Sequence, residues 1–491
     1  VFSAIAGYAQ DKHSIINDSL QNTVVDTTKQ DYKLYNNIHK VAKKRKWTSR
    51  LFDLVFDYTP PTNEIEKNEE KPIESAFLPY EGKPIRNIDV TTLSPFGTNI
   101  NDPDTVKTNW LNGAFNSVHT NTRKFVVHAN LLFKEGELLD PYIMAETETY
   151  LRQLGFISDA RILLEHVENN DSVDVKVIVQ DKFSLGFDIK NVSFSKFDVE
   201  LYDRNILGFG SELGIRYLYN KNGEYVTGYG IRLVDPNIFR TFFRTELSYL
   251  KDNNSKTVKV SVERPIQTSL KYIGGLSYTY RNSPMKILLL NDTIIRLSQE
   301  NFSATFGRVF KINDLNPYSR LVVAGRFMYR NNLSKLITSD KYPYLNYPFE
   351  KRSLWLTSVS LFQQKRYRGN MIYNFGVTED IAYGYNITAQ AGYEKHVYFD
   401  RAYASIGASV GKNFKFGYIY TKGEYGSYFR NGRPEQGVVR FYSSYFSPLI
   451  KIGRGTFRQF SSIDYTEGIR RLNDADELIF FSHLTDLNTN K

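Results

Sequence analysis

The feature that most constrains the fold is a two-residue alternation of apolar and polar side chains that recurs along residues 184–491. Val258, Val260 and Val262, for example, are separated by single polar residues. About fifteen segments of roughly ten residues show the pattern. Polar turns separate them, such as those at 220–224, 251–256 and 430–437. A period of two is that of a β-strand whose two faces meet different surroundings.

The length of these segments distinguishes between classes of β-protein. Strands of soluble sandwiches and propellers average about five to six residues, whereas a tilted strand needs about ten to cross a bilayer. Lipid offers no hydrogen-bond partners, so a membrane sheet must close on itself. The 35 Tyr and 34 Phe gather near segment ends, as in interfacial girdles. The expected fold is mainly β: a transmembrane antiparallel β-barrel of about 16 strands.

Composition argues against covalent chemistry. The absence of cysteine excludes disulfides, thiolate metal sites and a Cys nucleophile. Gly407, Ser409 and Gly411 fit the hydrolase pattern G-x-S-x-G, but that motif needs a strand, a turn and a helix, and here the alternation continues without a break. The net charge of +10 comes from interleaved bases and acids, which requires no nucleic acid. We therefore expect no enzyme activity, no catalytic or metal-ligating residue and no cofactor.

The N-terminal part divides into three segments. Residues 1–9 are similar to the end of a secretory signal peptide, although a short apolar strand is the alternative. Residues 10–61 form a helical segment, with an apolar stripe at helical spacing between 30 and 57. Residues 62–83 are charged and without periodicity, which is typical of a linker.

Residues 84–183 form a second unit of mixed α and β pattern. A strand-like stretch at 84–93 is followed by a helix that Asp140 caps, with Pro141 in its first position and Gly155 as its terminator. Two strands, 160–167 and 173–180, end the unit.

This unit resembles a POTRA module, a periplasmic strand–helix–helix–strand–strand domain, from Phe133 to the final VDVKVIVQDK. The segment after it resembles the start of barrels of the BamA-like superfamily, which includes surface antigens and two-partner secretion translocators. The matching positions are Asp203, Asn205, Gly208 and Gly210; Asp235 and Pro236, followed by Asn237; Glu263 and Pro265; and Glu379, Asp380 and Gly384, in a stretch similar to a Bacteroidota-type branch.

The resemblance implies an outer-membrane protein whose N-terminal part lies in the periplasm and which helps to insert or translocate polypeptides. Pairing with strand edges would be its physical means. The expected client-binding edge of the POTRA-like unit consists of Ile157, Ala160, Arg161, Ile162, Leu163, Leu164 and Val167. The first barrel strand, 184–192, contains Gly186, Asp188 and Asn191, which pair weakly; it is either a lateral seam or an ordinary first strand. Outer-membrane lipid, polypeptide clients and other envelope proteins are the expected partners.

One departure from the family leaves an alternative open. The late R-G-F/Y loop motif is missing, and Glu467–Arg471 is the nearest string. Either the sequence is a fragment that stops before the motif, with an incomplete barrel, or the branch has lost it. The alternative function is a passive pore or a scaffold subunit of an envelope complex. Such a protein would need neither a lateral seam at the first barrel strand nor a client-binding strand edge. Its lumen would be lined by Glu212, Arg216, Arg232, Arg244 and Glu246.

Overall fold

The computed structural model of the 491-residue chain describes residues 72–106, 109–167, 171–265, 269–287, 293–312, 318–334, 350–373, 378–452 and 455–471. The signal-peptide remnant at 1–9, the helical segment at 10–61 and residues 62–71 of the expected linker lie outside these ranges. The chain divides into two compact units, and all the described residues belong to one of them, formed by residues 69–373 and 377–477.

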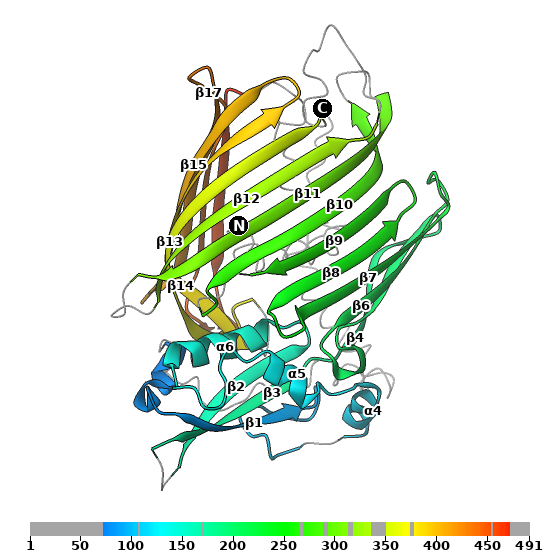
Figure 1. Cartoon of the computed structure of the whole chain (residues 1–491). Coiled ribbons are helices and arrows are strands. Elements are labelled where there is room, and N and C mark those ends of the chain that lie inside the picture. Colours follow the sequence, from blue (N-terminus) through cyan, green and yellow to red (C-terminus); the bar gives the residue numbers. More distant parts are fainter. Residues whose placement is uncertain are drawn as a thin grey trace. The chain divides into compact units, whose positions relative to one another are not determined.

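A small α+β domain comes first (Figure 1). Its elements are the 3-10 helices η1 (Ile73–Ala76) and η2 (Leu78–Tyr80), strand β1 (Ile85–Leu93), helices α4 (Trp110–Val118), α5 (Lys124–Ala129) and α6 (Pro141–Gln153), and strands β2 (Ile157–His166) and β3 (Val173–Asp181). The sheet order is β1-β3-β2, with β1 parallel and β2 antiparallel to β3. Helix α5 contacts β1 and helix α6 contacts β2 around one apolar core. The domain contains one helix more than a strand–helix–helix–strand–strand order.

Helix α6 begins as the sequence predicts. The Asp140 side chain accepts hydrogen bonds from the backbone N–H groups of Tyr142 and Ile143, and Pro141 occupies the first turn. These contacts satisfy donors that the first helical turn cannot pair internally. The inward face of the helix includes Met144 and Leu151, both fully buried.

The prediction of a linker over 62–83 is wrong for residues 72–83. Ile73 and Phe77 lie in the core of the small domain, and Phe77 is only 1% exposed. The Gly82 N–H donates to the Leu139 carbonyl, which ties this stretch to the entry of α6. Two apolar residues four positions apart are enough to bury one turn of helix. The charged residues around them leave no helical pattern in the sequence by which this turn could be predicted.

A single antiparallel sheet of 15 strands follows, in the order β20-β17-β16-β15-β14-β13-β12-β11-β10-β9-β8-β7-β6-β5-β4. The strands are β4 (Leu185–Ser193), β5 (Lys196–Asp203), β6 (Glu212–Asn220), β7 (Thr227–Ile238), β8 (Phe243–Lys251), β9 (Lys256–Arg264), β10 (Tyr272–Ile287), β11 (Thr293–Lys311), β12 (Ser319–Asn332), β13 (Arg352–Asn370), β14 (Thr378–His396), β15 (Asp400–Phe414), β16 (Gly417–Arg430), β17 (Arg433–Phe446) and β20 (Phe460–Ile469). A short 3-10 turn, η3 (Ile206–Gly208), joins β5 to β6, and β18 (Ile450–Ile452) forms a separate two-stranded sheet with β19 (Gly455–Phe457).

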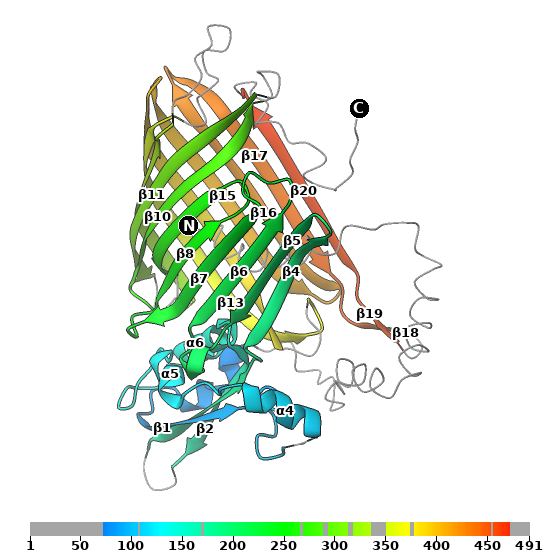
Figure 2. The same cartoon turned by 90° about the vertical axis from the view of Figure 1, so that its right-hand side faces the viewer.

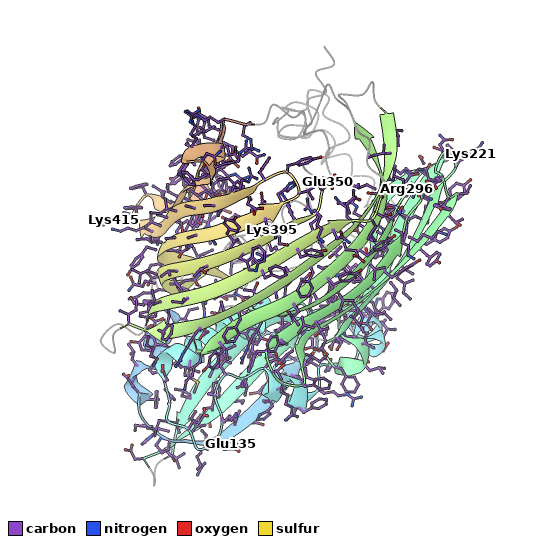
Figure 3. The ribbon with its side chains drawn as sticks, turned by 45° about the horizontal axis from the view of Figure 1, so that its top comes forward. Glu135, Lys221, Arg296, Glu350, Lys395 and Lys415 are labelled. Atoms are coloured by element: carbon purple, nitrogen blue, oxygen red, sulfur yellow. The ribbon has the colours of Figure 1, made fainter. Side chains whose placement is uncertain are left out.

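The expected mainly β fold, a small α+β domain followed by a large antiparallel sheet, is confirmed. Figure 2 shows the large sheet curling so that β10 and β11 face β17 and β20. In Figure 3, Lys221 and Arg296 lie at the end of the sheet remote from the small domain, which carries Glu135. Arg296 forms an ion pair there with Glu224.

The polarity of the sheet is the reverse of that in a soluble protein. Along β15, Ala404, Ile406 and Val410 are exposed, whereas Ser405 and Ser409 on the other face are partly shielded. Soluble monomers rarely expose contiguous apolar patches larger than a few hundred Å². An exposed apolar face over a shielded polar one is the arrangement of a membrane barrel. Ser409 also lies within an unbroken strand, so it is not on a nucleophile elbow.

Among the helices of the described ranges, none combines the length and the hydropathy that a transmembrane helix requires.

We predict that Gly384→Ala destabilises the sheet. Gly384 has φ +132°, and a Cβ atom there would lie 2.0 Å from the Gln363 carbonyl oxygen of the neighbouring strand. The expected cost is at least about 1–3 kcal/mol of backbone strain. Gly423→Ala is the matched control in β16, because a Cβ atom there meets nothing within 4 Å. Denaturant midpoints of the folded, heat-modifiable form in detergent measure both, and equal midpoints would contradict the prediction.

Candidate functional site: the joint between the small domain and the sheet

The turn between β5 and β6 carries the D-x-N motif, and the buried side-chain amide of Asn205 holds it. The Asp203 carboxylate accepts a hydrogen bond from the Asn205 backbone N–H (2.9 Å). The Asn205 side-chain oxygen accepts from the Gly210 N–H (2.7 Å), which closes the turn. Its Nδ2 donates to the Thr122 hydroxyl of the small domain (2.9 Å). Asn205 therefore both shapes the turn and binds the small domain.

The glycines of this motif allow close approach. Gly208 has φ +77°, and a Cβ atom there would lie 2.6 Å from the Asn121 carbonyl oxygen. At Gly210, with φ +74°, it would lie 2.7 Å from the Phe156 ring. Any side chain would push the turn away from the domain, and with it the hydrogen bond from the Arg123 N–H to the Gly208 carbonyl (3.1 Å).

The turn between β7 and β8 contains the same set of hydrogen bonds. The Asp235 carboxylate accepts from the Asn237 N–H (2.9 Å), and the Asn237 side-chain oxygen accepts from the Phe242 N–H (2.6 Å). Asn237 Nδ2 donates to the Ala129 carbonyl at the end of α5 (2.8 Å). In both turns the asparagine bonds a backbone N–H five residues later and a group of the small domain. The D-x-N spacing is the sequence signal of this contact.

A cluster of buried charges forms the third contact. We name Glu148 and Arg152 of α6, Arg368 of β13 and Asp380 of β14 the buried charge cluster. Arg152 binds Asp380 through two parallel bonds, Nε to Oδ2 (2.8 Å) and Nη2 to Oδ1 (2.6 Å). Arg152 Nη1 also donates to Glu148 (2.7 Å), which accepts from Arg368 Nε (3.0 Å) and is 0% exposed. Two positive and two negative groups balance each other; the side chains of Arg152, Glu148 and Asp380 are buried, whereas that of Arg368 is one third exposed.

These charges shift each other's pKa. Burial by itself raises the pKa of Glu148, but the positive charges of Arg152 and Arg368 outweigh it and hold the pKa below its ordinary value. Burial by itself lowers the pKa of Arg152, and the carboxylates of Asp380 and Glu148 raise it above the usual range. Burial raises the pKa of Asp159, beside the cluster, although Arg152 opposes this.

The cluster also changes the expected client-binding edge. Strand β2 is an edge of the small sheet. Arg152 Nη1, however, donates to the Ala160 carbonyl (2.7 Å), and Glu148 accepts from the Ile162 N–H (3.1 Å). The edge is therefore already occupied at Ala160 and Ile162, contrary to the prediction of a free edge over 157–167. Sequence pattern identifies an edge strand, but it does not show which side chains reach across to it.

The remaining residues of that edge differ in their surroundings. The side chains of Ile157, Ala160 and Ile162 lie in the core. The Val167 N–H donates to the Ser172 carbonyl across the hairpin (3.4 Å). Arg161 and Leu164 are partly buried, and Leu163 is exposed. Among the described residues, no side chain bonds the outward backbone groups of the 164–166 stretch, so the edge is open there.

Two further turns and one strand end contact the small domain. The Ser269 N–H donates to Glu146 of α6 (2.9 Å), and the rings of Tyr142 and Tyr318 meet edge to face at 4.7 Å. A backbone bridge joins Pro72 to Tyr367. We name all these contacts, from the β5–β6 turn to the β13–β14 turn, the joint. It bonds successive turns at one end of the sheet to a single small domain with its own apolar core.

Three motif residues lie elsewhere. The Glu379 carboxylate accepts from the Ile372 and Tyr373 N–H groups, so it closes the β13–β14 turn. Glu263 lies in β9 opposite Gly275, and Pro265 follows the end of that strand. No described contact brings Glu263 or Pro265 to the small domain.

The five expected lumen charges lie in ion pairs on the polar side of β6–β8. Arg216 binds Asp198 through two bonds (2.8 and 2.6 Å), and Arg232 lies 2.5 Å from Glu212 and 3.4 Å from Glu200. Glu246 lies 3.1 Å from Arg244 and 3.0 Å from Lys259. Sequence reasoning missed the partners Asp198, Glu200 and Lys259. Their alternation with apolar residues along β5 and β9 was the available signal.

The two ends of the large sheet are a further candidate site. Among the described strands no ladder joins β4 to β20. All neighbouring strands are antiparallel, and the sheet contains 15, so β4 and β20 run in the same direction. A single strand antiparallel to both would therefore fit between them.

Comparison with known proteins gives structural similarities only. No family model and no curated protein sequence matches the chain. The chain is similar to BamA from Haemophilus ducreyi lacking POTRA domains 1–3 (11% identity, 78% of this chain and 73% of that chain, TM-score 0.31). It is also similar to CdiB from Acinetobacter baumannii (10% identity, 91% and 100%, TM-score 0.34) and to CdiB from Escherichia coli (8% identity, 90% and 100%, TM-score 0.30).

We predict that Arg152→Met loosens the contact of the small domain with the β13–β14 end of the sheet. The substitution leaves Glu148 with one basic partner fewer and Asp380 without its bidentate partner, and breaking a buried ion pair costs about 3–5 kcal/mol. Arg86→Met is the control in the same domain, because Arg86 pairs with Asp174 at an exposed position and should change little. Protease sensitivity of the small domain in the folded protein measures both. Equal cleavage rates for the two variants would refute the role of the cluster.

The cluster also predicts a pH dependence. Because the folded-state pKa of Glu148 is lowered, its contribution to stability is complete above its unfolded pKa of about 4.3 and is lost as pH falls through the folded value. Glu148→Gln should therefore be less stable than the wild type at pH 7, and the difference should shrink below about pH 4. Comparing the two proteins also cancels the opposite contribution of Asp159, whose pKa is raised. Denaturant unfolding at several pH values tests this, and a constant difference down to pH 3 would contradict it.

Proposed function

We propose that this protein is an outer-membrane β-barrel that assists the insertion or translocation of polypeptides through strand-edge pairing. The observation that carries the proposal is the pair of sheet ends, β4 and β20, which run in the same direction with no ladder between them in the described strands. A polypeptide segment in extended conformation, antiparallel to both, would satisfy both edges.

The membrane assignment is supported by the reversed polarity of the sheet. Exposed apolar residues alternate with polar ones that are shielded or paired on the other face, as outer-membrane barrels require. The longest connection between strands, residues 333–351, leaves the end of the sheet opposite the joint. Outer-membrane barrels have short periplasmic turns and longer outer loops, so the small domain would lie in the periplasm.

Strand β4 has the composition of an edge that exchanges partners. Gly186, Asp188 and Asn191 are poor strand formers. The β4–β5 register shifts between Ile189 and Asn191, which interrupts the ladder. A short, irregular edge strand loses less on opening than the long ladder of β13 and β14, whose 19-residue strands pair throughout.

The joint gives the small domain a defined part in this proposal. Because successive turns are bonded to one small domain, the end of the sheet nearest that domain is held in place from β5 to β14. The strands outside this span are β4 at one end and β15, β16, β17 and β20 at the other, and each is held by the ladder to its neighbouring strand. Opening would therefore concentrate at the seam rather than spread around the sheet.

A passive pore is the second candidate, favoured by the charged polar face. Ion pairs such as Arg216–Asp198 and Arg232–Glu212 lie along it, and they would suit a water-filled lumen. Steady conductance in planar bilayers without any client contact would support this candidate.

We predict that photo-crosslinking residues at Phe187 of β4 and Ile463 of β20 capture a client strand. The probe is an unfolded eight-stranded outer-membrane barrel protein, labelled and added to vesicles that contain the purified full chain. Ile406 of β15 is the control, because it is similarly exposed but both of its neighbouring strands are paired. Crosslinks at both edges and not at Ile406 are expected. Equal crosslinking at all three positions, or none at the edges, would refute edge pairing.

A further inference from the structure

Helix α4 has an unusual surface for a helix at the outside of a domain. Its nine residues, WLNGAFNSV, include no charged side chain, and none of them is buried. The helix is nevertheless well formed, because the Asn109 side chain accepts from the Asn112 N–H at its start (2.7 Å). A solvated helix normally presents charged residues on its outer face.

One side of α4 is fixed to the start of the large sheet. The Phe115 ring packs against Phe96 (5.6 Å) and Phe183 (5.8 Å), which themselves lie 5.6 Å apart. Phe183 precedes the first residue of β4, Leu185, by two positions. The helix therefore lies next to the start of β4, the first strand of the large sheet, and beneath that strand in Figure 1.

The other side of α4 carries an exposed apolar stripe. Trp110 is 68% exposed and Val118 is 59% exposed, and they are eight residues apart with exposed Ala114 between them. Positions i, i+4 and i+8 share one helix face. Val106, just before the helix, is exposed as well. A tryptophan beside small apolar residues is typical of a helix that lies in a membrane interface.

The neighbouring turns continue this surface. Phe125 of α5 meets Phe209 of the β5–β6 turn at 5.9 Å, and both are exposed. Leu207 and Phe239 are exposed as well, Phe239 to 88%. Both adopt positive φ, 51° and 52°, which costs about 1–2 kcal/mol for residues with a side chain. Two turns at this end of the sheet thus hold large apolar side chains outward in strained backbone.

Basic residues accompany the apolar ones. The Arg123 guanidinium lies 4.2 Å from the centre of the Phe209 ring, and Lys124 and Arg240 are exposed. Lipid headgroups supply the phosphate that such side chains bind, while acyl chains accept the neighbouring rings. The exposed apolar face of β4 begins with Leu185 and Phe187. Phe183, which packs on α4, therefore lies where the apolar face of the sheet meets the apolar and basic residues of the small domain and its turns.

We propose that this surface lies on the periplasmic leaflet of the membrane around the barrel, with α4 embedded at the boundary between headgroups and acyl chains. The surface consists of Val106, Trp110, Ala114, Val118, Phe125, Leu207, Phe209 and Phe239, with Arg123, Lys124 and Arg240. The partner is a phospholipid surface. The inference rests on the proposed outer-membrane barrel and adds a second membrane contact, which fixes the tilt of the small domain beside β4–β8.

Tryptophan quenching tests the inference and the barrel separately. The chain contains three Trp, at positions 47, 110 and 355, and Trp355 lies on the exposed face of β13. The full chain with Trp47→Phe and Trp355→Phe reports Trp110 alone, and Trp47→Phe with Trp110→Phe reports Trp355. Both are reconstituted in phosphatidylethanolamine–phosphatidylglycerol vesicles that contain acyl chains brominated at shallow or deep positions.

We expect quenching of Trp355 and, for Trp110, stronger quenching by shallow than by deep bromine with blue-shifted emission. Quenched Trp355 with unquenched, water-exposed Trp110 would overturn the inference and leave the barrel standing. If neither residue is quenched, the proposed barrel fails. Both outcomes are interpreted on heat-modifiable, folded protein.

A second measurement avoids the tryptophan substitutions. Because the chain has no cysteine, Ala114→Cys on the stripe and Glu165→Cys on β2 each give one labelling site, and both positions are exposed. A nitroxide at 114 should be more accessible to oxygen and less accessible to a nickel chelate than one at 165. Equal accessibility at the two sites would overturn the inference.

Discussion

Backbone hydrogen bonding in an apolar environment is the constraint on which the rest of this structure depends. A sheet with an exposed apolar face can lie in lipid only if its N–H and C=O groups are paired within the sheet. The ladders from β5 to β17 meet this requirement, with β13 and β14 in register over their whole length. The outer sides of β4 and β20 do not meet it within the described strands, and this is why the proposed function centres on them.

The joint fixes the small domain at one end of the large sheet. Asn205 and Asn237 use one amide each to shape a turn and to bind the small domain, and the buried charge cluster fixes the β13–β14 turn to α6. The same cluster occupies part of the β2 edge. The same side chains therefore hold the small domain on the sheet and bond the backbone groups of Ala160 and Ile162.

Local patterns predicted much of this fold, and contacts distant in sequence account for the rest. Alternation identified the large sheet, Asp140 marked the start of α6, and the motif at Asp203 and Asn205 marked a turn early in the sheet. The pairing of Arg152 with Asp380 joins residues 228 positions apart and leaves no local signal. Ile73 and Phe77 give too weak a pattern among charged residues to predict a buried turn, and the hydrogen bond to the Ala160 carbonyl depends on a side chain from another element.

Membrane fractionation of the full-length protein, combined with heat-modifiability on a gel, tests the central claim most directly. We expect an outer-membrane fraction and a band that shifts on boiling, because a long hydrogen-bonded membrane sheet resists unfolding by detergent until it is heated. A soluble protein whose band does not shift would contradict the barrel, the strand-edge function and the lipid-facing surface together.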